Sequence, residues 1–179
     1  MGPPFGRLPM CHILGVTPEA QDMEAAFQGS VPSSVEVLKV GRNELNQVRD
    51  SLKGPAGDLD LVTLGCPFYG IEDLKAVARL LRGKRVNPNV QLWIWTDAAT
   101  RSVASRMNLV QQIEKAGGSV LTDTCAVTCP MDQCDHSFRN VMTDSIKEMA
   151  FYRQSGKYNV SLGTTEACIE AAVKGKVEP

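Results

Sequence analysis

The chain has 179 residues, of which 43% are hydrophobic and 22% are charged, and its formal net charge is −1. This composition is typical of one globular domain with a sizeable core, and the near-neutral charge gives no reason to expect a nucleic acid or an anionic membrane as partner. No apolar run approaches the roughly 18 residues of a membrane span, and "MGPPFGRLPM" lacks the order of a secretory signal. We therefore expect a cytoplasmic protein whose six cysteines stay reduced, as buried thiols, metal ligands or catalytic groups.

Strand patterns recur along the chain. Each is a short run of apolar or β-branched residues, and the clearest is "VQLWIWT", which is continuously apolar and aromatic. In chain order, the predicted strands lie at 11–16, 35–40, 59–65, 90–96, 119–125, 139–145 and 159–163.

A helical pattern follows six of the seven predicted strands, all except the one at 119–125. Residues 17–27 have Thr17 as an N-cap and Pro18 at the first helical position, and the last helix has Thr164 or Thr165 as its cap. The remaining patterns lie at 43–54, 71–83, 99–118 and 146–154, and the last of the chain covers 164–175. The chain therefore reads as about seven β–α units.

This alternation predicts an α/β domain over residues 1–179, with a mostly parallel sheet and helices on both faces. In such sheets ligands bind at the carboxyl ends of the strands, where the strand-to-helix loops converge. Two of these loops carry a cysteine at or just past the strand end, Cys66 and Cys125. Their thiolates could hold a soft metal or an iron–sulfur cluster, and the alternative is that both are small buried apolar residues.

The stretch "TDTCAVTCPMDQCDH" suggests a zinc site at first, because it holds three cysteines and His136. Its spacing, C-x3-C-x4-C-x-H, is not one of the tight C-x2-C knuckles of zinc ribbons and fingers. Cys125 also belongs to a strand end, whereas Cys134 and His136 fall in a polar loop. A zinc module over 125–136 is therefore the least favoured interpretation. We expect Cys129, Cys134 and His136 to have no part in a metal site.

The segment "TDSIKEMAFY" places Ser145 and Lys147 at a strand-to-helix turn. A hydroxyl at a helix N-terminus with a lysine nearby suits the binding of a carboxylate or a proton transfer. The alternative is an N-cap serine and a solvated lysine. Neither a phosphate-binding glycine loop nor a G-x-S-x-G nucleophile elbow occurs in the sequence.

Six segments stand out for their order and spacing: "HILGVTPEA", "LGCPFYGIEDLKAVARLL", "QLWIWTDAATRSVA", "GGSVLTDTCAV", "NVMTDSIKEMAFY" and "GTTEACIEAAVKG". Together they resemble the catalytic region of the aconitase X family. The resemblance covers roughly residues 11–175 and is most specific at the GCP and TDTC motifs. It implies an aconitase-like three-layer α/β/α fold, with the whole chain similar to the C-terminal part of the catalytic region.

The resemblance also implies an activity. Family members are iron–sulfur hydro-lyases, of the cis-3-hydroxy-L-proline dehydratase type in bacteria and fungi and of the phosphomevalonate type in archaea. The cysteines of the GCP and TDTC motifs are cluster ligands there, which corresponds to Cys66 and Cys125. A third ligand lies further towards the N-terminus in full-length members, and a small swivelling domain or subunit helps to close the active site. Both would be partners that this chain lacks.

The S-x-K position of the family corresponds to Ser145 and Lys147, for which we expect a role as base or carboxylate binder. The chain departs from the family at Phe68, where a histidine often follows GCP, and at Cys129, which precedes Pro130. Two alternatives to a small-molecule dehydratase stay open at this point. One is a non-catalytic α/β module with part of the cluster site, and the other is the zinc module.

Overall fold

The computed structural model describes residues 11–129 and 138–178. The chain divides into two compact units, Met1–Val48 and Arg49–Pro179. In the first unit, the described residues form a single short helix, α1 (Met23–Ala26), whose N-cap is Asp22. A second helix, α2 (Arg42–Ser51), spans the boundary and has no buried residue. The large apolar side chains of the first unit are mostly exposed, Leu38 at 79% for example, so this unit has no core of its own among its described residues.

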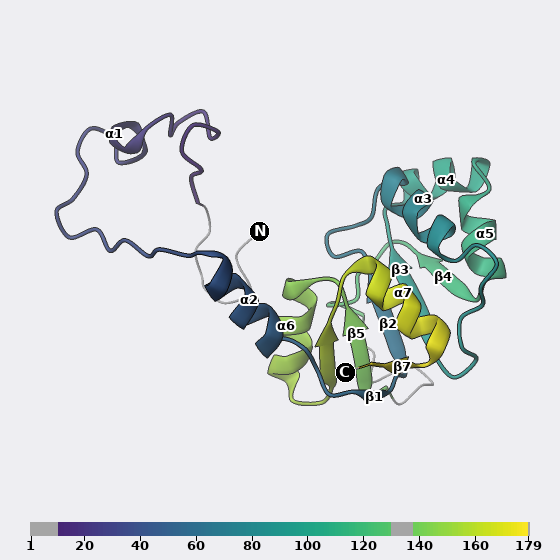
Figure 1. Ribbon diagram of the computed structural model, residues 1–179. Helices are drawn as coiled ribbons and strands as arrows, with labels where there is room; N and C mark the ends of the chain where they lie inside the picture. Colours follow the sequence, from purple (N-terminus) through teal and green to yellow (C-terminus); the bar gives the residue numbers. More distant parts are fainter. Residues whose placement is uncertain (1–10, 130–137, 179) are drawn as a thin grey trace. The chain divides into compact units, whose positions relative to one another are not determined.

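The second unit is built on a five-stranded parallel sheet with the strand order β4-β3-β2-β5-β6 (Figure 1). The central strand β2 is buried at all four positions, because it has a neighbour on each side and a helical layer on each face. The strands are β2 (Leu61–Leu64), β3 (Gln91–Trp95), β4 (Gly118–Leu121), β5 (Asn140–Thr143) and β6 (Asn159–Leu162). A separate antiparallel pair joins β1 (Gly57–Asp58) to β7 (Lys176–Val177).

Helices cover both faces of this sheet. On one face, Val62 and Ile94 belong to a core cluster with apolar residues of α3, α5 and α7. On the other face, Leu61 and Trp95 pack with Met149 and with Tyr152, both of α6. The helices are α3 (Ile71–Leu80), α4 (Ala98–Arg106), α5 (Leu109–Lys115), α6 (Ile146–Ser155) and α7 (Thr165–Lys174). The predicted α/β class with a parallel sheet and two helical layers is confirmed.

The strand predictions hold only in the second unit. Strands form within or overlapping 59–65, 90–96, 119–125, 139–145 and 159–163, but residues 11–16 and 35–40 form none. Both of these apolar segments are exposed, with Val37 at 72% and Ile13 at 60%. A strand needs a neighbouring strand for its backbone hydrogen bonds, and these two segments have none in the part of the chain that the structure describes.

The single helix predicted over 99–118 is in fact two helices. Asn108 adopts a left-handed conformation, with φ at +60°, which ends α4 and begins α5. The first predicted helix is also shorter than expected, because Asp22 and not Thr17 caps it. The Thr164 cap is confirmed, since its hydroxyl accepts the Ala167 N–H. Among the described residues, no helix is long and apolar enough to cross a membrane.

Candidate functional site

The connections from β2 and β5 leave these neighbouring strands on opposite faces of the sheet. The chain passes from β2 to α3, which packs on one face, and from β5 to α6, which packs on the other. In parallel α/β sheets, ligands bind beside the carboxyl ends of two strands at such a reversal. The residues at that point are Cys66, just past β2, and Asp144 and Ser145, just past β5.

The loop after β2 has a backbone that only glycine accommodates well. Gly65 has φ at +100°, and a Cβ at this position would collide with the carbonyl oxygen of Trp95 in β3. The loop is held further along by the Tyr69 N–H, which donates to the same carbonyl at 3.0 Å. The Cys66–Pro67 peptide bond is cis. The GCP motif therefore places the half-buried Cys66 thiol directly at the end of the central strand.

Cys125 lies in the loop after β4, and its thiol is close to the side chain and the backbone amide of Thr128. The Thr128 hydroxyl lies 3.3 Å from Cys125 Sγ and is also within reach of the Cys125 backbone. Burial acts to raise the pKa of Cys125, but the hydrogen bonds from Thr128 and the Val127 amide, with the charge of Lys147, outweigh it. The pKa of Cys125 is consequently lower than that of an ordinary thiol.

Ser145 and Lys147 lie in the first turn of α6. Ser145 is the N-cap residue, and its Oγ accepts the Glu148 N–H at 3.3 Å. The same residue acts to lower the pKa of the Cys66 thiol, so the two side chains lie in one environment. Lys147 is half-buried and close enough to influence both Cys66 and Cys125. The N-cap alternative for Ser145 is therefore correct, yet it does not exclude a place in the site.

The four residues singled out in the sequence thus come together. Burial raises the pKa of the Cys66 thiol, and Glu148 and Cys125 add to this effect. Ser145 and the charged Lys147 act to lower the pKa of the same thiol. Residues that are up to 81 positions apart in the sequence (66 to 147) share one electrostatic environment at the carboxyl edge of the sheet. Their roles as ligands or catalytic groups stay predictions.

Sequence reasoning missed Glu148, whose side chain is completely buried behind Ser145. The Thr143 hydroxyl donates to Glu148 Oε2 at 3.1 Å, while Oε1 is buried without a hydrogen-bond partner among the described residues. Burial raises the pKa of Glu148 to about 7, against the lowering influence of the nearby Thr63, Tyr152 and Thr143 hydroxyls. The S-x-x-E spacing from Ser145 to Glu148 was the available signal, but it predicts an exposed capping box and not a buried acid.

A second missed feature is a polar group that joins three loops. The Tyr69 hydroxyl donates to Asp144 Oδ2, and Thr165 donates to the same oxygen at 2.9 Å. Tyr69 follows β2, Asp144 follows β5 and Thr165 begins α7. Burial and the neighbouring Asp144 raise the pKa of Tyr69, which keeps it a hydrogen-bond donor. This group links the loop that contains Cys66 to the loop after β5 and to the start of α7.

Three other cysteines among the described residues have surroundings that differ from those of Cys66 and Cys125. Cys168 is buried in the core cluster of α3, α5 and α7, Cys129 packs against the α6 face, and Cys11 is exposed in the first unit. The other two members of the zinc hypothesis, Cys134 and His136, lie outside the described residues. Within residues 11–129 and 138–178, no group of three or more His, Cys, Asp or Glu side chains is arranged to hold a metal ion.

An iron–sulfur cluster is usually held by three or four protein thiolates. The edge of the sheet offers two, Cys66 and Cys125, from separate loops. The lowered pKa of Cys125 and the positive charge of Lys147 both favour thiolates, the form that binds iron. The donor set therefore fits part of a cluster site, and a further ligand would have to come from beyond these described loops.

The fold and the site define an α/β domain that gathers two cysteines, a serine and a lysine at the switch point of a parallel sheet. The family model for the aconitase X third domain matches residues 59–174, and the chain belongs to the aconitase X family. The resemblance inferred from the GCP and TDTC motifs is thereby confirmed.

The curated relatives that match this chain are dehydratases of two kinds. The phosphomevalonate dehydratase large subunit of Methanocaldococcus jannaschii is 29% identical over 171 residues, 96% of this chain and 39% of the relative. The cis-3-hydroxy-L-proline dehydratase of Pseudomonas aeruginosa is 32% identical over 173 residues, 94% of this chain and 29% of the relative. The crystal structure of holo-form Thermococcus kodakaraensis aconitase X superposes with a TM-score of 0.67 at 28% identity, over 82% of this chain and 37% of the other.

The chain therefore spans less than half the length of these relatives. Both named relatives are dehydratases, so the family to which the chain belongs is one of enzymes that remove water from small molecules.

Proposed function

We propose that this chain is the third-domain part of a hydro-lyase that removes water from a small hydroxy acid such as cis-3-hydroxy-L-proline, with an iron–sulfur cluster as cofactor. The observation that carries the proposal is the meeting of Cys66, Cys125, Ser145 and Lys147 at the carboxyl edge of the sheet. The names of the relatives support the reaction class, and the two dehydratase names differ in substrate.

Cys66 and Cys125 would supply two of the protein ligands of the cluster, with a third from the rest of the enzyme. When bound, such a cluster would supply a Lewis-acidic iron to the substrate carboxylate and the departing hydroxyl. Lys147, whose charge acts to lower the pKa of both cysteines, would favour their thiolate forms.

Dehydration removes a proton from one carbon and hydroxide from its neighbour, and a double bond forms between them. Ser145, as an alkoxide, would take the proton, because the positive end of α6 and the Lys147 ammonium both favour an oxyanion there. The Lys147 ammonium would alternatively bind the substrate carboxylate. Tyr69 and Asp144 hold the surrounding loops and contribute to the site by position.

Anaerobic reconstitution with iron and sulfide tests the cluster. Thiolate-to-iron charge-transfer bands should appear in the visible spectrum and be lost in Cys66→Ser and in Cys125→Ser. Cys168→Ser is the matched control, because Cys168 lies in the core away from this edge. The titration is made on the chain alone and in the presence of the remaining part of the large subunit. Bands that persist in both ligand variants would contradict the assignment.

Turnover by the full-length enzyme tests Ser145. Ser145→Ala should lower kcat by at least about a hundredfold if Ser145 is the base. Ser145→Thr retains a hydroxyl and the N-cap, so it separates loss of the base from loss of the helix cap. Unchanged turnover in Ser145→Ala would exclude Ser145 as the base.

We further propose that the full enzyme covers the apolar side chains of residues 11–48 with another segment or subunit. Val37, Leu38 and Val40 are each at least 66% exposed, which is unusual for neighbouring large apolar residues. Relatives are described as large subunits and are more than twice as long as this chain. Co-purification with the remainder of a full-length large subunit or with a small subunit tests this proposal. The cytoplasmic location and the extent of the domain stay predictions.

The alternative function is a non-catalytic α/β module that retains the fold and part of the site. It is favoured by one observation, that the described loops bring only two cysteines to the edge. A chain that binds no iron, alone or with the remainder of the large subunit, would support this alternative.

A further inference from the structure

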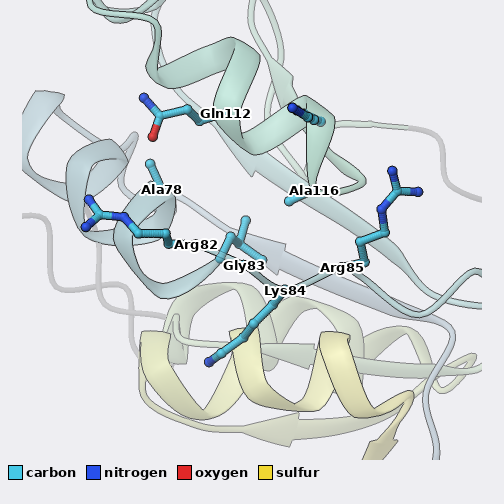
Figure 2. A pocket seen from close by; sticks show the side chains of 9 residues that line it. Ala78, Arg82, Gly83, Lys84, Arg85, Gln112 and Ala116 are labelled. Carbon is cyan, nitrogen blue, oxygen red and sulfur yellow. The ribbon is translucent and has the colours of Figure 1, made fainter.

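A cavity of about 400 Å³ lies where α3 and α5 end (Figure 2). Its apolar part consists of the buried residues Ala78, Leu81 and Ala116. The rest of the lining comes from the loop Gly83–Arg85, which leads towards β3, and from the second half of α5, which leads to β4. We call this cavity the α3–α5 pocket. It lies at the amino ends of these strands, at the opposite edge of the sheet from the cysteines.

The polar lining of the α3–α5 pocket is cationic. Arg82, Lys84, Arg85 and Lys115 line it, together with the amide of Gln112, and the lining contains no carboxylate. In the part of the chain that the structure describes, Arg82, Arg85 and Lys115 make no ion pair or side-chain hydrogen bond. Lys84 is directed towards α7 (Figure 2), where it lies close to Glu170. Three cations therefore surround the pocket without a counter-charge, in a chain whose net charge is −1.

Cations often gather at the carboxyl ends of helices, because the terminal carbonyls carry a partial negative charge. Here two of these carbonyls already accept backbone N–H groups, and in the described part of the chain no side-chain hydrogen bond joins the three cations to them. The Leu81 carbonyl accepts the Lys84 N–H at 3.0 Å, and the Ala116 carbonyl accepts the Val86 N–H at 2.8 Å. The helix ends are thus capped by their own loops, and the cationic side chains remain available for another group.

We propose that the α3–α5 pocket binds a compact, multiply charged anion of the diphosphate class. Arginine presents paired N–H groups that fit phosphate oxygens, and concave sites lined with one sign of charge concentrate the opposite sign. The volume lies within the range of small-ligand sites, and the alanine and leucine surface would accept an organic portion. Because the pocket is at the opposite edge of the sheet, this inference is independent of the proposed dehydratase chemistry.

Calorimetric titration of the 179-residue chain with inorganic pyrophosphate, at low ionic strength, tests the proposal. A single saturable site is expected. Arg85→Gln and Lys115→Gln should each weaken binding by about fivefold, and the double variant by more. The control is Arg106→Gln, which removes an exposed cation just before the other end of α5. The variants change exposed side chains, and unchanged circular dichroism shows that each one folds.

The affinity should also fall as salt is raised, because the contacts are charged and partly exposed. Absence of saturable binding, or an equal loss in Arg106→Gln, would overturn the proposal. A parallel titration with citrate separates phosphate from carboxylate. Binding of citrate more tightly than pyrophosphate would overturn the assignment to the diphosphate class.

Discussion

At the scale of single residues, the ionisable groups of the site differ in which interactions shift their pKa values. Cys125 is surrounded by hydrogen-bond donors, whereas Cys66 is influenced more by burial. Glu148 is buried with one oxygen unpaired, although a buried polar group without a partner is costly. Such groups concentrate at functional sites, and Glu148 influences the pKa of Cys66.

The first prediction concerns the pH dependence of stability. The pKa of Glu148 is raised to about 7 in the folded chain from an ordinary value of 4.5. The folded state therefore holds its proton more tightly, and this contribution to stability is complete below pH 4.5 and lost as pH rises through 7. Glu148→Gln should remove this fall in the free energy of unfolding, which is at most roughly 3 kcal/mol. Urea unfolding at pH 5 and at pH 8 measures the difference in that free energy.

The matched control for this measurement is Glu72→Gln, at an exposed glutamate paired with Lys75. It should leave the difference between pH 5 and pH 8 as it is in the parent chain. An equal pH dependence in the parent and in Glu148→Gln would show that Glu148 is not the titrating group.

The second prediction concerns thiol reactivity in the metal-free chain. The pKa of Cys125 is lowered and the pKa of Cys66 is raised, so Cys125 should react with iodoacetamide faster than Cys66 at pH 7.5. Thr128→Val should slow the reaction of Cys125, because the hydroxyl that hydrogen-bonds its sulfur is lost. Peptide mass spectrometry at timed intervals gives both rates. Equal rates for Cys125 in the parent and in Thr128→Val would contradict the role of Thr128.

At the scale of elements, the junction of β2 with its following loop is the most constrained point. Gly65 combines a positive φ with close contact to the β3 backbone, and the next residue is Cys66. The same loop is joined to Asp144 through Tyr69. Precise placement of the thiol therefore depends on strand pairing between β2 and β3 and on the loop after β5.

Gly65→Ala is expected to destabilise the chain by about 1–3 kcal/mol or more, because it adds backbone strain and a collision with the Trp95 carbonyl. Gly83→Ala is the matched control. It has φ at +73° but open space around the added methyl group, so it should cost less. Thermal unfolding of both variants measures the difference. Equal destabilisation would show that the collision is relieved by movement of the loop.

At the scale of the whole molecule, the two units differ in how they are stabilised. The second unit holds two core clusters, one on each face of the sheet. In the first unit, Ala20 is the buried hydrophobic residue among those described, and large side chains such as Val16 and Leu38 are exposed. Burial of apolar area is the main favourable contribution to folding, so the stability of the chain resides in the second unit.

A truncated chain of residues 49–179 should therefore fold and unfold at nearly the same temperature as the full chain. Its solubility should increase, because the exposed apolar side chains of residues 11–48 are removed. Differential scanning calorimetry and dynamic light scattering measure the two properties. A large fall in the unfolding temperature would show that residues 11–48 contribute to the core.

The sequence by itself determined the local features of this protein. Period and composition identified the five strands of the sheet and the helical segments after four of them, because each depends on its own residues. The motifs around Cys66 and Cys125 identified the family for the same reason. The two apolar segments at 11–16 and 35–40 satisfy the same local criteria, yet they form no strand, since a strand also depends on a partner.

Only the tertiary structure decided which chemical groups meet. The burial of Glu148 depends on β2, β5 and α6 together, and its spacing from Ser145 predicts an exposed cap instead. The cationic α3–α5 pocket likewise gathers residues from two helix ends that are about thirty positions apart. Desolvation and Coulomb interactions depend on distance in space and not on distance along the chain, which is why the sequence identified the two cysteines but not their environment.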